Sequence, residues 1–140
     1  MGTAAPEALN AMRALQGYVD RCGLEAKLLE LVKIRASQIN GCAFCIAMHV
    51  RDAVKAGETH ERIHLLNAWR EAPLYTEREQ AALAWTEAVT LLGRESVPDE
   101  VYERARHAFS EKEIVELTVA VVVINGWNRL MIAFRRPPEI

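Results

Sequence analysis

The sequence predicts an all-α protein, a single domain over residues 1–140 built as a bundle of about seven helices. Glycine and proline divide the chain into amphipathic segments of helical length, and no segment shows the alternating pattern of a surface strand. Hydrophobic residues make up 51% of the chain and charged residues 26%, as in an ordinary globular domain. No repeat, low-complexity tract or long linker divides the chain, so one core is expected.

Four helices are expected in the first half of the chain. Their approximate ranges are 6–20, 24–39, 41–57 and 59–71. The first stops near Gly23, and the second ends at the turn-forming pair Asn40-Gly41. Gly57 caps the third, and Pro73 closes the fourth.

Three further helices are expected in the second half. Thr76 and Glu79 form a capping box for the fifth, and the sixth begins around Pro98, a favoured first-turn residue. Ser110 starts the last helix through a second capping box. The β-branched run at 119–124 would also suit a buried strand. Helix is preferred because apolar residues continue beyond this run to residue 134.

Charge and hydropathy exclude several classes of protein. Seventeen basic against nineteen acidic side chains give a formal net charge of -2, which argues against nucleic acid as a partner. The N-terminus lacks the basic start and apolar run of a secretory signal, so a cytoplasmic protein is expected. The longest uncharged apolar run, 117–124, is far shorter than a bilayer span, so no membrane segment is expected.

Cys42, Cys45 and His49 are the residues most indicative of chemistry. At about 100° per residue they share one face of the third helix. Apolar residues lie on that face and Arg51 and Lys55 on the other, so the thiols and the imidazole are expected to point inward. Three cysteines without an export signal argue against a secreted disulfide framework and leave metal binding or redox chemistry.

Each of these side chains has a role that its chemistry suggests. The N–H groups of a first helical turn favour a thiolate, which is the reactive form of cysteine. His49, one turn after Cys45, can take or return the proton near neutral pH. Once a peroxide oxidises one sulfur to a sulfenic acid, the other can condense with it to a disulfide, which an external dithiol would reduce. The helix terminus favours Cys42 as the more acidic thiol, whereas proximity to His49 favours Cys45.

Other interpretations of the motif stay open. A zinc site would need a fourth ligand from Cys22, His60, His64 or His107, none of which repeats a ligand-pair spacing. Covalent haem attachment is excluded because Ile46, not histidine, follows the second cysteine. The three side chains could also be purely structural. Cys22 itself is expected to be an inert small core residue.

The motif and its surroundings resemble the AhpD-like alkylhydroperoxidases of the carboxymuconolactone decarboxylase superfamily. Residues 30–56, reading ELVKIRASQINGCAFCIAMHVRDAVKA, are similar to that family's central helical hairpin. The resemblance continues through 68–70 (AWR) and 84–85 (AW) to 125–129 (NGWNR), and so covers most of the chain. Ala43 and Phe44 stand between the cysteines, where some members carry a histidine; this bears on substrate preference rather than on mechanism.

The resemblance implies a thiol-dependent peroxidase and a role for each residue. Cys45 would attack the peroxide, Cys42 would resolve it, and Glu30 and His49 would relay the proton. A hydroperoxide would be the substrate and a dithiol, such as a lipoyl or thioredoxin-like donor, the reductant. Family members assemble as trimers or hexamers, so a homo-oligomer is expected. No cofactor and no metal ion are expected.

Two charged residues of the second helix need separate consideration because of their positions relative to its apolar stripe. Glu30 lies roughly opposite the main apolar stripe, which by itself predicts a solvated side chain. Only the resemblance reverses this, by implying that other helices or a neighbouring subunit cover that face. Arg35 falls within the stripe, where it would snorkel or pair with a buried carboxylate.

Two alternative functions differ in kind from the peroxidase. Lactone decarboxylation, the other activity of the superfamily, would use acid–base residues without needing a cysteine pair. A non-enzymatic helical module would use the thiols to hold zinc or to sense oxidation.

Overall fold

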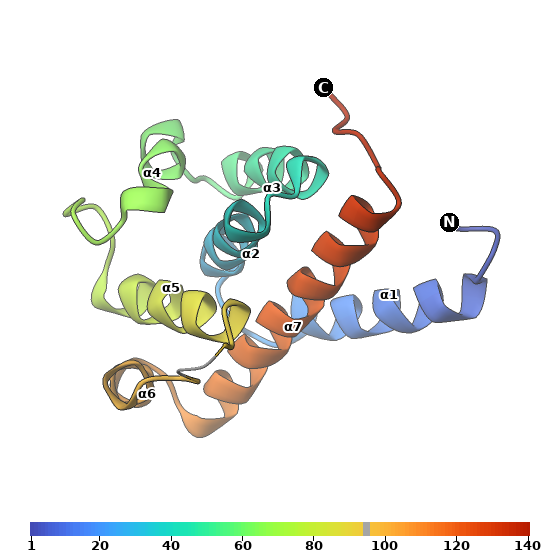
Figure 1. The fold of residues 1–140 in the computed structure, drawn as a ribbon. Helices are drawn as coiled ribbons and strands as arrows, with labels where there is room; N and C mark the ends of the chain where they lie inside the picture. Colours follow the sequence, from blue (N-terminus) through green and yellow to red (C-terminus); the bar gives the residue numbers. More distant parts are fainter. Residues whose placement is uncertain (94–95) are drawn as a thin grey trace.

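The computed structural model describes residues 1–93 and 96–140, and these residues form seven α-helices and one 3-10 turn without any strand (Figure 1). In chain order the elements are α1 (Pro6–Arg21), α2 (Ala26–Asn40), α3 (Ala43–Lys55), α4 (His60–His64), η1 (Leu66–Ala68), α5 (Glu77–Thr90), α6 (Asp99–Ala108) and α7 (Glu111–Ala133). The predicted all-α fold is confirmed.

Local capping signals explain where the later helices begin. Thr76 and Glu79 form a complete capping box at the start of α5, and Ser110 and Glu113 form another at the start of α7. Pro98 is the residue immediately before α6. The β-branched run at 119–124 lies within the 23-residue helix α7, so the preference for helix over strand was right.

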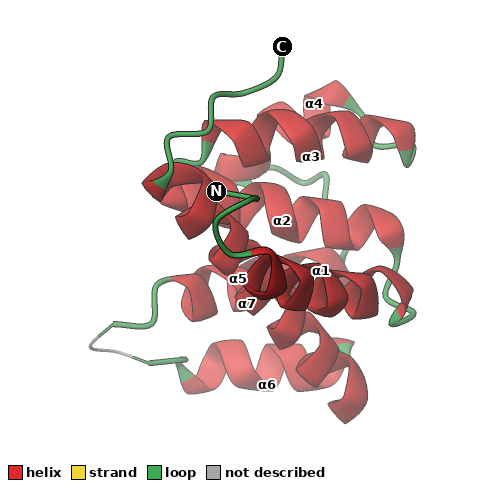
Figure 2. Cartoon of the chain, turned by 90° about the vertical axis from the view of Figure 1, so that its right-hand side faces the viewer, coloured by secondary structure: helices red, strands yellow, loops and turns green. Residues whose placement is uncertain are grey.

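Helix α2 is the centre of the fold and contacts α3, α5 and α7 (Figures 1 and 2). Eight of its fifteen residues are buried, namely Leu28, Leu29, Leu31, Val32, Lys33, Ile34, Ala36 and Ser37. Figure 2 shows α3 and α4 on one side of α2 and α6 on the far side, with α1, α5 and α7 between. Because α2 has neighbours nearly all round, the single-stripe picture used for it in the sequence analysis was too simple.

The expected fourth helix is shorter than predicted. Residues 59–71 form only the five-residue α4 followed by the 3-10 turn η1. The apolar residues Ile63, Leu66 and Trp69 recur every three positions and are all buried. A spacing of three keeps side chains on one face in a 3-10 turn but not in a long α-helix, which accounts for the change.

Helix α7 is long and apolar enough, by length and composition alone, to cross a membrane. No such segment is predicted from the sequence, because Glu116 and the polar residues from Asn125 onward bound the short uncharged apolar run. Eight residues of α7 are nevertheless buried against other parts of the chain, among them Leu117, Val121 and Asn128. The core helix of a globular fold meets the same criterion, and no membrane role is assigned to α7.

Candidate functional site: a cysteine pair beside a buried carboxylate–histidine pair

A tight turn between α2 and α3 positions the two cysteines. Gly41 ends α2 in the left-handed region, with φ of 72°, where a side chain would be strained. The next N–H, that of Cys42, donates to the carbonyl of Ser37 at 3.0 Å. Cys42 is the N-cap of α3, because its Sγ accepts a hydrogen bond from the Cys45 N–H at 3.3 Å. Helix geometry places both sulfurs at the positive end of α3.

Cys42 and Cys45 are joined by a disulfide, with 5.4 Å between their Cα atoms. Both residues are about 1% exposed, so the prediction that the thiols face inward is confirmed. The two differ in access, because Cys45 lines the large cavity described below whereas Cys42 does not.

A network of amides holds this turn against α7. The Asn40 side chain donates from Nδ2 to the Oδ1 atoms of Asn125 and Asn128, at 2.9 Å each. Asn128, which is fully buried, donates in turn to the Ser37 hydroxyl at 2.9 Å. The sequence of residues 125–129 by itself assigns no role to this segment. The structure shows that two of its side chains fix the end of α2 next to the cysteines.

His49 and Glu30 form a close pair between α3 and α2. His49 Nδ1 lies 2.8 Å from Glu30 Oε2, and the histidine is 6% exposed. The Glu30 side chain is 12% exposed, so the solvated position that its helical phase predicts is wrong. Its cover comes from this same chain, since α3 contributes His49, and Asp20 of α1 lines the same cavity.

Lys33 completes the pair and was missed by the sequence analysis. Its ammonium group lies 2.8 Å from Glu30 Oε1 and 3.9 Å from Asp20, and the residue is buried. Its position one turn after Glu30 was the available signal, because residues three apart share a helix face. A buried lysine is stable only beside negative charge, and Glu30 supplies it.

These contacts set the ionisation of Glu30. Burial by itself raises the pKa of this carboxyl, but the hydrogen bond to His49 and the charge of Lys33 outweigh it, so the pKa lies below its usual value. Glu30 is therefore ionised near neutral pH and accepts a hydrogen bond from the N–H of His49 Nδ1. That hydrogen bond leaves Nε2 as the nitrogen able to exchange a proton.

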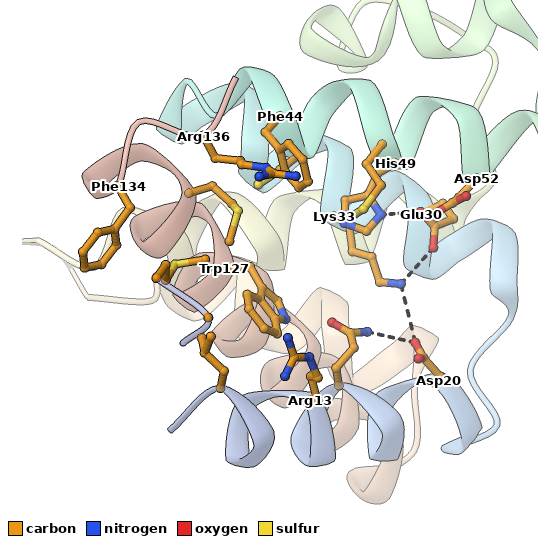
Figure 3. A pocket seen from close by; sticks show the side chains of 17 residues that line it. Arg13, Asp20, Glu30, Lys33, Phe44, His49, Asp52, Trp127, Phe134 and Arg136 are labelled. Carbon is orange, nitrogen blue, oxygen red and sulfur yellow. Dashed lines mark hydrogen bonds and ion pairs between the residues drawn. The ribbon is translucent and has the colours of Figure 1, made fainter. Parts of the chain in front are cut away.

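Cys45, His49 and Glu30 open onto one cavity of about 780 Å³ (Figure 3). Its walls include the aromatic side chains Phe44, Trp127 and Phe134, together with the methionines Met48 and Met131. Figure 3 shows Glu30, His49, Lys33 and Asp52 gathered at one end and Phe134 and Arg136 at the other. A small oxidant therefore has an approach to Cys45 from an apolar chamber.

The same end of the cavity holds the one group of potential metal ligands found among residues 1–93 and 96–140. Glu30, His49 and Asp52 each offer a ligand atom, and these atoms lie within 4.8 Å of one another. The group includes neither cysteine of the motif and none of the four residues considered as a fourth zinc ligand. Lys33 occupies the second oxygen of Glu30, which disfavours a divalent cation there.

Two residues weighed in the sequence analysis lie outside the site. Cys22 is a free, half-buried thiol packed against the main core, as expected of a small core residue. Arg35 pairs with a carboxylate rather than snorkelling: its Nε donates to Glu87 Oε1 of α5 at 2.9 Å.

Comparison with known proteins places this geometry in context. Residues 6–88 match the carboxymuconolactone decarboxylase family. The uncharacterized protein YdfG of Bacillus subtilis is 45% identical over 129 residues, which is 92% of this chain and 88% of that protein.

Solved structures share the fold. A protein of unknown function from Agrobacterium tumefaciens, with the suggested name antioxidant defence protein AhpD, superposes with a TM-score of 0.96 at 45% identity, over 99% of this chain and 95% of that one. The debrominase Bmp8, solved as a C82A variant with 2,3,4-tribromopyrrole, superposes with a TM-score of 0.85 over 99% of this chain and 74% of that one. At 19% identity, this second likeness concerns the fold alone.

Proposed function

The chain is an AhpD-like member of the carboxymuconolactone decarboxylase family, and from that premise we propose that it is a dithiol-dependent peroxidase. One observation carries the proposal: in the disulfide pair Cys42–Cys45, the second cysteine lines a cavity that is also lined by the hydrogen-bonded residues Glu30 and His49. An oxidant, a thiol and a proton relay can meet there.

In the first step the Cys45 thiolate attacks the hydroperoxide. The sulfur takes the terminal oxygen, the O–O bond breaks, and Cys45 becomes a sulfenic acid while the alcohol leaves after receiving a proton. His49 Nε2 supplies that proton, having first removed one from the Cys45 thiol. Glu30 stabilises the imidazolium between these events through its 2.8 Å contact with Nδ1.

In the second step Cys42 resolves the sulfenic acid. Its thiol gives up a proton, the resulting thiolate attacks Cys45 Sγ, and the S–O bond breaks as the disulfide forms. The hydroxide that leaves takes up that proton and departs as water. This step would produce the Cys42–Cys45 disulfide, and the presence of that bond supports the proposal. The Cys45 N–H and the N-terminus of α3 stabilise negative charge on Cys42, which keeps this thiol ready to attack.

A dithiol donor then resets the enzyme. Its thiolate attacks Cys45, the sulfur that faces the cavity, and Cys42 departs as the stabilised thiolate. The second donor thiol releases Cys45 and leaves as a cyclic or intramolecular disulfide. In this scheme Cys42, at the N-terminus of α3, serves as resolving and leaving group, while Cys45, which lines the cavity, reacts with the peroxide and with the donor. A lipoyl or thioredoxin-like donor fits this chemistry, and such donors act in the cytoplasm, where thiols are kept reduced.

We also propose a homo-oligomer. Val115 and Val122, two turns apart on α7, are more than half exposed, as are Leu91 and Leu92 after α5. Val115 and Val122 share one face of α7, and an apolar helix face left exposed to solvent is typical of subunit contacts. Light scattering coupled to gel filtration measures the subunit number and separates a trimer from a hexamer.

The test is peroxide-dependent oxidation of a small dithiol by the wild type and by Cys45→Ser and Cys42→Ser. We expect Cys45→Ser to be inactive. Cys42→Ser should consume one equivalent of peroxide and accumulate a sulfenic acid that dimedone traps and mass spectrometry locates on Cys45. Equal slow peroxide consumption by all three proteins would refute the peroxidase. Trapping on Cys42 in Cys45→Ser would instead reverse the roles of the two thiols.

Turnover of a lactone substrate that persists in both cysteine variants would favour lactone decarboxylation. Zinc bound to the freshly purified protein would favour a zinc-binding module. Both outcomes are measured on the same preparations.

A further inference from the structure

The cavity in front of Cys45 is far larger than hydrogen peroxide requires. Its volume of about 780 Å³ falls within the range of sites that enclose whole organic ligands, whereas a water-sized molecule occupies roughly 30 Å³. A site for a small peroxide would need only a narrow channel. The size of the chamber therefore indicates a substrate with a bulky organic group.

The chamber walls indicate that this group is apolar. Phe44, Trp127 and Phe134 contribute aromatic surface, and Leu9 and Met131 contribute buried aliphatic surface. Methionine adapts to flexible apolar chains because its own side chain is unbranched and mobile. Apolar chains bind such walls through the hydrophobic effect, which needs no hydrogen bonds.

The charged side chains that line the chamber are, with one exception, already paired. Within the described part of the chain, Lys33 contacts Glu30 and Asp20, as noted above. Asp52 lies 3.6 Å from Lys55, and Arg136 lies 2.7 Å from Glu139.

Arg13 is the exception. Over residues 1–93 and 96–140 its guanidinium contacts no carboxylate within 4 Å, and its one side-chain hydrogen bond is to the neutral amide of Asn10 at 3.1 Å. Figure 3 shows the Arg13 side chain rising from α1 toward Trp127, across the chamber from Phe44. An arginine in this position can bind a carboxylate in bidentate fashion.

From this arrangement we infer that the preferred substrate is a long-chain hydroperoxide that carries a carboxylate, as in an oxidised fatty acid. The carboxylate binds Arg13, the hydrocarbon chain lies along Trp127 and Met131, and the hydroperoxide group reaches Cys45. This inference rests on the proposed peroxidase for its chemistry, and the peroxide is reduced by the steps given above. Its ligand-binding part rests only on the cavity and on Arg13, and does not need the peroxidase chemistry.

The decisive experiment compares a hydroperoxy fatty acid with its methyl ester, which differs only in lacking the negative charge. We expect the wild type to show kcat/KM about tenfold or more higher for the acid, as a charge-assisted hydrogen bond predicts. In Arg13→Gln the ratio should fall to near one, and Arg13→Lys should restore part of it. Arg21→Gln is the matched control, because Arg21 lies on the same helix and does not line the chamber. It should keep the wild-type ratio.

A binding measurement keeps this inference separate from the peroxidase. Calorimetric titration with dodecanoate and dodecanol, neither of which is a peroxide, should show tighter binding of dodecanoate to the wild type and equal binding of both to Arg13→Gln. If no peroxide is reduced but dodecanoate binds in this way, the peroxidase fails and the anionic-ligand site stands. Equal kcat/KM for acid and ester in the wild type, or an Arg13→Gln protein that keeps the preference, would overturn the inference.

Discussion

Helix α2 carries two charged pairs on nearly opposite faces, and they serve different purposes. On one face Glu30 contacts His49 and Lys33 beside the Cys45 cavity. On the other face Arg35 contacts Glu87, which also accepts hydrogen bonds from Trp69 and Arg70. The second cluster adjoins no thiol and does not line the large cavity.

The two clusters use similar residues, so composition does not separate a site from a structural contact. The two clusters are distinguished by their access to the cavity and by the residues that surround them. In the proposed mechanism Glu30 holds the histidine that exchanges protons with Cys45, whereas Glu87 holds α2, the segment at Trp69 and α5 together. Changes to the first cluster should alter rates and pH dependence, and changes to the second should alter stability.

Among changes to these two clusters, His49→Ala should have the largest effect. Losing a general acid–base typically costs about 10²- to 10⁴-fold in rate, and we expect a fall in this range in the rate of Cys45 oxidation by peroxide. Stopped-flow measurement of the oxidation step checks this directly. His64→Ala, an exposed histidine on α4, is the matched control and should react like the wild type. A His49→Ala protein with an unchanged rate would remove the Glu30–His49 pair from the mechanism.

Lys33→Met should have a smaller effect that depends on pH. Lys33 helps to hold the pKa of Glu30 below its usual value, so removing it raises that pKa. The proposed proton relay needs Glu30 to be ionised, so activity falls in acid as Glu30 becomes protonated. When the pKa of Glu30 rises, the acid limb of the kcat/KM profile should therefore move to higher pH. Lys27→Met, a change on the same helix at a residue that pairs with Glu58, should leave the limb in place. A uniform loss at every pH would mean that Lys33 acts only on structure.

Glu87→Gln should affect stability rather than rate. Burial raises the pKa of Glu87, but hydrogen bonds from Trp69, Arg70 and Arg35 outweigh it and the pKa is lowered. A lowered folded-state pKa gives stability that is present above the unfolded value, about 4.3, and is lost as pH falls through the folded value. We expect urea unfolding at pH 7 to show a loss of about 1–3 kcal/mol. The difference from the wild type should shrink in acid, while activity per folded molecule is kept. A difference that stays constant down to pH 3 would contradict this account.

Cys22→Ser should have the smallest effect. Cys22 is free, packs against the main core and lies outside the cavity. Peroxidase activity and the number of equivalents of peroxide consumed should match those of the wild type. Any loss of turnover would show that a third thiol takes part.

The amino-acid sequence by itself determined the helical elements and the grouping of Cys42, Cys45 and His49. Both are local properties: a capping box involves residues three apart, and the face that a residue occupies follows from its distance along one helix. The structure agrees with both predictions. The fourth helix is shorter than predicted, because burial of Leu66 and Trp69 favoured a 3-10 turn.

Tertiary structure alone decided which helix faces are covered. Periodicity states where Glu30 lies relative to its own helix, but not that His49 of another helix would contact it. The sequence likewise did not predict the contact of Asn40 with α7, nor that among residues 1–93 and 96–140 no carboxylate pairs with Arg13 at the cavity. Each of these contacts, or the lack of one, depends on segments that are distant along the chain, and a one-dimensional pattern carries no information on which segments meet.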